Sequence, residues 1–222
     1  MPLVLPGNEV SLNQPGSRFH RHHHLNGYAA LLVSGSCHEV GDSGRFHARA
    51  GDVLIHEGFH GHADRIGARG ARFINIPLKS SLDAKSGKVA DLDVVVRAFE
   101  RDGNEGVDAF HEQFRPTAYA PADWPDLLAE ELAEGRVVRL DNWARSKGVH
   151  PASVSRAFRL AYGITPKRFR LEQMAARAAR RLVGSAESLA IVAADAGFAD
   201  QSHMTRTFAD LFRITPASLR RL

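Results

Sequence analysis

Cysteine and long hydrophobic runs are both scarce in this chain of 222 residues. Cys37 is the single cysteine, which excludes an internal disulfide framework and a cysteine-based zinc finger. No apolar run approaches the roughly 18 residues that a membrane span requires, and the first residues lack the basic stretch and the uninterrupted apolar stretch of an export signal. The chain is therefore expected to remain in the cytoplasm and to have no membrane partner.

Charge and histidine are unevenly divided along an otherwise ordinary composition. Hydrophobic residues at 44% and charged residues at 24% are typical of a folded protein and exclude the disordered and coiled-coil classes, and the length favours two small domains. Residues 1–135 contain 13 Lys and Arg against 19 Asp and Glu, whereas residues 136–222 contain 16 against 6. Nine of the twelve histidines fall between residues 20 and 62. The basic second half is thus expected to meet a polyanion while the first half has a different role.

The basic half contains an internal repeat with an offset of 49 to 50 residues. The first copy comprises Gly148, Ser155-Arg156-Ala157-Phe158 and Ile164-Thr165-Pro166. The second copy comprises Gly197, Thr205-Arg206-Thr207-Phe208 and Ile214-Thr215-Pro216. Each copy predicts a helix, a glycine turn and a second helix, with Asp141 as the first N-cap and a helix over residues 166–183 joining the copies. One copy would fit an ordinary helical bundle as well, but two copies in a basic segment favour paired helix-turn-helix units.

These motifs resemble the DNA-binding domain of the AraC/XylS family of transcription regulators. The stretch Ala144-Arg145-Ser146-Lys147-Gly148-Val149 looks like the start of the family's first helix-turn-helix, and residues 191–208 are similar to the family signature. The resemblance covers about residues 122–222. Two positions depart from the family pattern, because Arg213 stands where glycine is usual and His150 replaces the usual serine or threonine cap.

The resemblance implies two recognition helices, over residues 151–160 and 201–212, that enter successive segments of the major groove about 34 Å apart. By matching position, eight side chains would face base edges: Ala152, Ser155, Arg156, Gln201, Ser202, His203, Thr205 and Arg206. Arginine can pair with guanine and glutamine with adenine through two hydrogen bonds, which makes Arg156 and Arg206 the main candidates. The alternative for both is a phosphate contact or a carboxylate partner inside the domain. The arginines of the joining helix, together with Arg220 and Arg221, are expected to contact phosphates or solvent.

Short apolar runs with glycine turns between residues 18 and 78 predict an antiparallel sandwich or barrel. The segment His20-Arg21-His22-His23-His24, followed by residues 51–62, looks like the two halves of a cupin signature, and such sensor barrels commonly precede the DNA-binding domain in AraC-type regulators. The expected fold is α+β in two domains, with a cupin-like antiparallel β-barrel before an all-α domain of two helix-turn-helix units. The expected boundaries are 1–80 for the barrel, 81–121 for a helical connector and linker, and 122–222 for the DNA-binding domain.

The histidines of the first half are candidate ligands for a small molecule or a metal. Cupin metal sites combine a His-x-His pair, a glutamate a few residues later and a histidine from the second motif. The pair could be His20 and His22 or His22 and His24, and a later histidine could supply the third nitrogen to a divalent transition metal. The candidates are His20, His22, His24, His60 and His62. The glutamate is missing, since Tyr28 and two uncharged residues occupy that neighbourhood, so a metal-free ligand pocket and an exposed strand end are the alternatives.

Between the two halves, helices are predicted over residues 89–101 and 107–114. Their apolar face would pack either on the barrel or against a second subunit. The residues of that face are Val94, Val95, Ala98 and Phe99. Helices at this place in the chain resemble the dimerisation elements of the family, so a homodimer is a candidate assembly.

The leading hypothesis is a sequence-specific regulator of transcription that binds double-stranded DNA under the control of a small-molecule effector, with RNA polymerase as a candidate partner and with no catalytic activity. One alternative is a metal-dependent cupin enzyme with a helical appendage, which the missing glutamate disfavours. A second alternative is a helical adaptor that binds protein, which gives no reason for arginines at matching positions of both units.

Overall fold

The computed structural model describes residues 10–78, 82–136 and 139–221. The chain divides into two compact units, of which the first comprises residues 1–57 and 62–120 and the second residues 58–61 and 121–222. Among the described residues, no helix is both long enough and apolar enough to cross a membrane.

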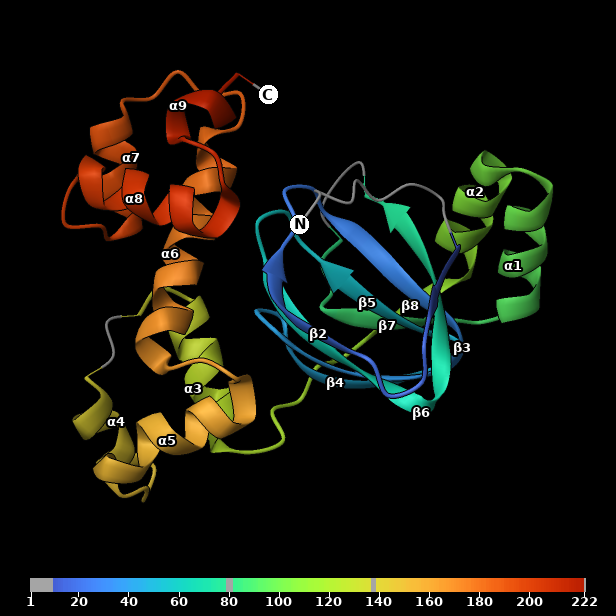
Figure 1. Ribbon diagram of the computed structural model, residues 1–222, viewed down its shortest axis with the longest axis horizontal. Helices are drawn as coiled ribbons and strands as arrows, with labels where there is room; N and C mark the ends of the chain where they lie inside the picture. The colour runs from blue at the N-terminus through green and yellow to red at the C-terminus, as the bar shows by residue number, and fades with distance from the viewer. Residues whose placement is uncertain (1–9, 79–81, 137–138, 222) are drawn as a thin grey trace. The chain divides into compact units, whose positions relative to one another are not determined.

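The first unit is built on one antiparallel sheet (Figure 1). Its strands are β1 (Val10–Asn13), β2 (Arg18–His23), β3 (Tyr28–Gly41), β4 (Gly44–Arg49), β5 (Asp52–His56), β6 (Gly61–Pro77), β7 (Ser86–Val89) and β8 (Phe114–Thr117). The strand order is β1-β6-β3-β5-β7-β8, with β2 paired to β6 and β4 paired to β3. Figure 1 shows the strands curving around a shared interior, as expected for a small barrel.

Both faces of this sheet are buried. Alternate residues of β3 belong to different hydrophobic clusters, because successive side chains of a strand point to opposite faces. Ala30 and Leu32 lie in a cluster inside the curved sheet, whereas Ala29 and Leu31 lie in a second cluster that includes Phe110 of a covering helix. The interior and the helix-covered face therefore form two separate cores.

A glycine contact bends the two longest strands, β3 and β6. The register between them shifts on both sides of Gly35, whose φ of 83° is in the left-handed region. A Cβ on Gly35 would lie 2.0 Å from the carbonyl oxygen of Gly70, so only glycine permits this approach. Beyond the bend the pairing resumes and places Glu39 directly opposite Asp64.

Residues 82–120, which include most of the predicted connector, lie within the first unit, and residue 121 belongs to the second. Residues 82–120 add β7 to β5 and β8 to β7, neither of which was predicted from the sequence. Between these strands, α1 (Leu92–Arg101) and α2 (Gly103–Gln113) begin at the N-caps Asp91 and Asp102, whose carboxylates accept backbone N–H groups. Val95 and Ala98 are buried within the unit, which corresponds to packing on the barrel, and Val94 stays exposed.

In the described part of residues 121–222, which form the main body of the second unit, all regular elements are helices (Figure 1). Its helices are α3 (Trp124–Ala133), α4 (Leu140–Ser146), α5 (Pro151–Tyr162), α6 (Pro166–Leu182), α7 (Leu189–Ala196), α8 (Gln201–Phe212) and α9 (Pro216–Leu219). The pairs α4–α5 and α7–α8 are the two helix-turn-helix units, and α6 joins them. The predicted fold class, an antiparallel sheet followed by paired helix-turn-helix units, is confirmed.

The helix ends follow the local sequence with one correction. Arg139 is the N-cap of α4 and Asp141 lies in its first turn, so the predicted cap was wrong. His150 caps α5 by accepting the N–H of Ala152 through Nδ1 at 3.3 Å. Arg213 adopts the left-handed conformation at φ 58°, as Gly163 does in the first copy. Both departures from the family pattern therefore leave the helix ends intact.

The long helix α6 provides the core of the second unit. It contacts α3, α5, α7, α8 and α9, which surround it in the second unit (Figure 1). Phe169 packs edge-on against Phe158 and Tyr162 of α5. Small residues such as Ala175 and Ala179 are fully buried along the helix and allow its neighbours to approach closely.

We expect Phe110→Ala to destabilise the first unit by about 3–5 kcal/mol, because Phe110 is fully buried between α2 and the sheet. Urea unfolding followed by circular dichroism would measure this loss. The two tryptophans, Trp124 and Trp143, lie in the second unit, so their fluorescence should report an unchanged transition. Val94→Ala is the matched control, because Val94 is 45% exposed, and it should change stability by less than about 0.5 kcal/mol. Equal effects of both variants would contradict the packing of α2 on the sheet.

Candidate functional site

The recognition helix α5 presents three of the predicted base-facing residues on its solvent side. Ala152, Ser155 and Arg156 are exposed, whereas Val154 and Phe158 are buried. The alternation follows the 3.6-residue period of an amphipathic helix. Small side chains beside Arg156 leave room for the helix to approach a groove.

The recognition helix α8 presents its predicted residues less evenly. Gln201, Ser202 and Arg206 are exposed, but His203 and Thr205 are half-buried. The His203 ring packs edge-on against Phe198 at 5.2 Å, and the Thr205 hydroxyl donates to the carbonyl oxygen of Gln201 at 2.9 Å. These two side chains are therefore engaged within the domain.

The two matching arginines are not paired with any described residue of the domain. Within residues 10–78, 82–136 and 139–221, the side chains of Arg156 and Arg206 make no ion pair or hydrogen bond. The carboxylate partner considered as an alternative is therefore not found among these residues. Both guanidinium groups are available to a ligand outside the domain.

Two arginines of the joining helix α6 are paired instead. Arg168 donates to Glu172 and to Asp210 of α8, each at 2.7 Å. Arg181 pairs with Asp195 of α7 at 2.7 Å and with Glu187 in the loop before it. Phosphate or solvent contacts were predicted for these arginines. Arg168 and Arg181 instead pair with carboxylates of the protein, and these pairs hold the second helix-turn-helix unit against α6.

A buried carboxylate holds the first recognition helix. Asp126 of α3 is 2% exposed and accepts the hydroxyl of Tyr162, the last residue of α5, at 2.8 Å. Its other oxygen accepts the N–H of Ala122 at 2.9 Å. Because a buried carboxylate needs such partners, the bond from Tyr162 fixes the end of α5 against α3.

A second candidate site lies in the interior of the first unit, where the sheet gathers imidazoles and carboxylates. His22 and His24 come from β2 and the residue after it, and His62 comes from the start of β6. Their ligand atoms lie within 4.8 Å of one another, and those of Glu39, His56 and His62 form a second such group in the described chain. Of the two predicted His-x-His pairs, the structure therefore brings His22 and His24 together with His62.

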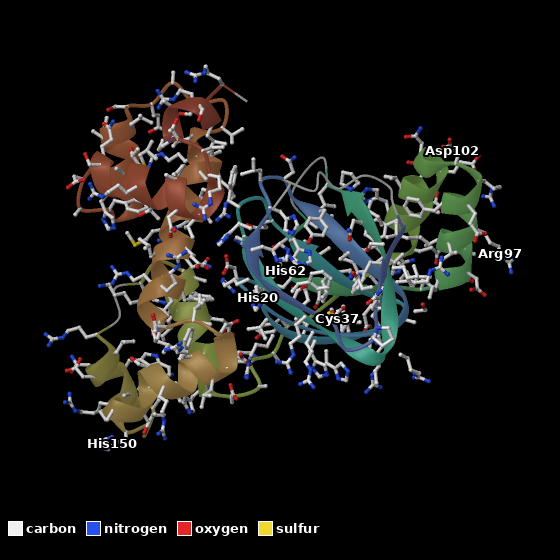
Figure 2. The ribbon with its side chains drawn as sticks, in the orientation of Figure 1. His20, Cys37, His62, Arg97, Asp102 and His150 are labelled. Atoms are coloured by element: carbon white, nitrogen blue, oxygen red, sulfur yellow. The ribbon has the colours of Figure 1, made fainter. Side chains whose placement is uncertain are left out.

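Two of the predicted histidines lie outside these groups. His20 is exposed on β2, and His60 is half-buried in the turn before β6. Figure 2 labels His20 and His62, which come from β2 and β6 respectively. Strand β2 alternates its side chains, and its exposed positions at Arg18 and His20 follow that alternation.

His62 is the centre of the interior network, because both of its ring nitrogens have neighbours. Its Nε2 lies 3.1 Å from His24 Nε2 and 3.1 Å from the Tyr28 hydroxyl. Its Nδ1 lies 3.3 Å from Glu39 Oε2 and 3.2 Å from Asp64 Oδ2. The His62 ring thus separates an imidazole-rich side from a carboxylate side.

The carboxylates decide the protonation of this network. Burial disfavours a charged His62, but the facing Glu39 and Asp64 raise the pKa of His62 to about 10. Burial and the neighbouring His62 lower the pKa of His24 to about 3, so His24 is a neutral imidazole near pH 7. Burial also raises the pKa of Tyr28, which keeps its phenol protonated. Buried Glu39 and half-buried Asp64 thus have a cationic partner, and the opposite side of His62 is uncharged.

Sequence reasoning missed Glu39 and His56. Glu39 lies well beyond the position where the cupin pattern has its glutamate, so the motif does not point to it. The signal that could have found it is the alternation of β3, in which Cys37 and Glu39 face inward and His38 faces outward. An inward charged residue on a strand needs a partner, and the nearby histidines are the natural candidates.

We expect Tyr162→Phe to destabilise the second unit by about 1.5–3 kcal/mol, because the variant removes a hydrogen bond to a buried carboxylate. Tryptophan fluorescence during urea unfolding would measure the change, since both tryptophans lie in this unit. Leu160→Ala, at a side chain 82% exposed on the same helix, should change stability by less than about 0.5 kcal/mol. A Tyr162→Phe protein as stable as the parent would show that Asp126 does not anchor α5.

Comparisons with known proteins bear on the second unit. A family model described as "Helix-turn-helix domain" matches residues 143–222. Among solved structures, ToxT from Vibrio cholerae aligns over 96% of this chain and 97% of that chain at 8% identity, with a TM-score of 0.43. An AraC-type transcriptional regulator from Chromobacterium violaceum aligns over 42% and 86% at 24% identity, with a TM-score of 0.39. A search of curated proteins found no match.

The TM-scores of these solved structures are too low to support an argument about function. The family model carries the argument, because residues 143–222 include the greater part of both helix-turn-helix units. The matched residues include the free arginines Arg156 and Arg206 and the helix that joins the units. The protein is therefore a DNA-binding transcription regulator with an AraC-type helix-turn-helix domain over residues 143–222.

Proposed function

We propose that α5 and α8 read base edges in two successive segments of the major groove, and that residues 122–222 act as one DNA-binding domain. The observation that carries this proposal is the contrast between two sets of arginines. Arg156 and Arg206 occupy matching, exposed and unpaired positions in the described domain, whereas Arg168 and Arg181 are paired with carboxylates. A structural arginine would be expected in the second set, and a base-reading arginine in the first.

The remaining predicted residues divide by exposure. Gln201 has the amide that pairs with adenine, and Ser202 at the start of α8 is placed for a phosphate or a base. Ala152 and Ser155 are small and would permit close contact, including with a thymine methyl group. His203 and Thr205 are half-buried and engaged, so we assign them a secondary role at the edge of the interface.

We further propose that the first unit, with the barrel of residues 1–80 and the segment 81–121, senses a small ligand. The His22, His24 and His62 group is the polar site where such a ligand would bind, while His20 and His60 lie outside it. A ligand would change promoter occupancy only by binding DNA-competent and DNA-incompetent states with different affinity. RNA polymerase and a second copy of the chain would then contact surfaces other than the exposed faces of α5 and α8.

No catalytic step is part of this proposal. The enzyme alternative would require turnover of a substrate at the histidine group, and the adaptor alternative would require a protein partner for α5 and α8. Neither explains why the exposed arginines recur at matching positions in a domain with 16 Lys and Arg against 6 Asp and Glu over residues 136–222.

Selection of bound duplexes from a random DNA pool, at two salt concentrations, tests the proposal. The expected motif has two clusters of specified bases about 10 base pairs apart. Arg156→Ala should relax one cluster and Arg206→Ala the other, each by about 1–3 kcal/mol of discrimination. Arg159→Ala, at an exposed position of α5, is the matched control and should weaken all sequences equally. Uniform weakening by Arg156→Ala would instead identify a phosphate contact, and binding without any motif would refute sequence-specific reading.

A further inference from the structure

We propose that the interior of the first unit binds one divalent transition-metal ion between Glu39, His56 and His62, on the side of His62 that faces the carboxylates. This position differs from the one that the cupin-like motif implies, which lies among His22, His24 and His62. The inference concerns the first unit alone and is independent of how the second unit reads DNA.

The motif position itself does not fit a metal well, because its carboxylate is replaced by Tyr28. The Tyr28 hydroxyl lies 3.3 Å from His24 Nε2 and 3.1 Å from His62 Nε2, in the place of an anionic ligand. Tyr28 is 5% exposed, and its ring stacks on His56 at 4.4 Å. A dication placed there would have three neutral imidazoles and a neutral phenol around it, so its charge would not be compensated within the group.

The carboxylate side offers the missing anionic ligand at metal-like spacing. Glu39 Oε2 lies 2.9 Å from His56 Nε2 and 3.3 Å from His62 Nδ1. Ligand atoms around a tetrahedral zinc ion with bonds of about 2.0–2.1 Å are about 3.3 Å apart, so these contacts already resemble edges of a coordination shell. The side chains of His56, His62 and Glu39 are 5%, 8% and 4% exposed, so solvent does not compete for the ligand atoms.

Charge and second contacts favour the same position. Asp64 Oδ2 lies 3.2 Å from His62 Nδ1, so a dication beside Glu39 would be neutralised by two carboxylates. The two imidazoles and the Glu39 carboxylate form a mixed nitrogen and oxygen set that suits zinc, cobalt or iron in the divalent state. The Nε2–H of His62 could then donate to Tyr28 or His24, which would fix the ring orientation as outer partners of metal ligands do.

The test uses full-length protein without an affinity tag, stripped with a chelator and titrated with Co²⁺, followed by competition with Zn²⁺. The expected result is one equivalent of bound metal with an intense visible absorption typical of low coordination number. Glu39→Gln should weaken Co²⁺ binding by more than about 100-fold, beyond the 10–100-fold cost of losing an outer partner. The double variant with His22→Asn and His24→Asn should change it by less than about 10-fold. His38→Asn, at an exposed residue of β3, is the control and should leave binding unchanged.

Several results would overturn the proposal. Loss of binding in the double histidine variant with retention in Glu39→Gln would place the metal at the motif position. Equal binding by all variants would indicate an adventitious surface ion, and no stoichiometric binding by the parent protein would exclude a metal site. Because Glu39→Gln could unfold the barrel, X-ray absorption of the parent protein loaded with Zn²⁺ provides a second measurement. Two imidazole ligands are expected at the proposed position, and three would refute it.

Discussion

The shared helix α6 is the constraint on which the DNA-binding half of the molecule depends. Both recognition helices, α5 and α8, contact α6, so this one element holds them relative to each other. The aromatic contacts of Phe169 hold α5, and the ion pair of Arg168 with Asp210 holds α8. DNA offers equivalent groove segments only once per helical turn, so a flexible joint would lose the simultaneous fit of both helices.

Buried charge imposes the corresponding constraint on the first unit. Glu39 lies inside the curved sheet and has His56 and His62 as partners, while Asp64 faces the same ring. Replacing these groups with apolar residues would give a simpler core, since a buried ion pair contributes little net stability. A barrel that retains such a network is therefore better explained by binding than by folding.

The parts of this structure that sequence predicts are those set by local rules. Gly148 and Gly197 end helices at positive φ, and Pro151 and Pro166 begin them, so the repeat was visible without any tertiary information. The exposed position of Arg156 followed from helical periodicity. The sequence could not reveal that Arg168 is paired with Asp210, because that contact joins residues 42 positions apart.

The interior site shows the same limit more clearly. The cupin pattern has its glutamate close to the His-x-His pair, where this chain has none, and the carboxylate near His62 comes instead from the middle of β3. The position of Glu39 depends on the bend at Gly35, because the register after this bend places Glu39 opposite Asp64. A local motif records the order of ligands along the chain, whereas the register of two long strands decides which side chains meet.

The two halves thus bring together different chemistry at different energetic scales. An exposed guanidinium can discriminate between bases by about 1–3 kcal/mol per contact, and two matching helices multiply that discrimination. A ligand or metal bound in the barrel can alter DNA occupancy only through its differential affinity for two states, and a shift from 1:99 to 99:1 requires about 5.5 kcal/mol. A dication bound between Glu39, His56 and His62 would favour the state of the barrel that brings these three ligands together, because charges interact strongly where water is excluded.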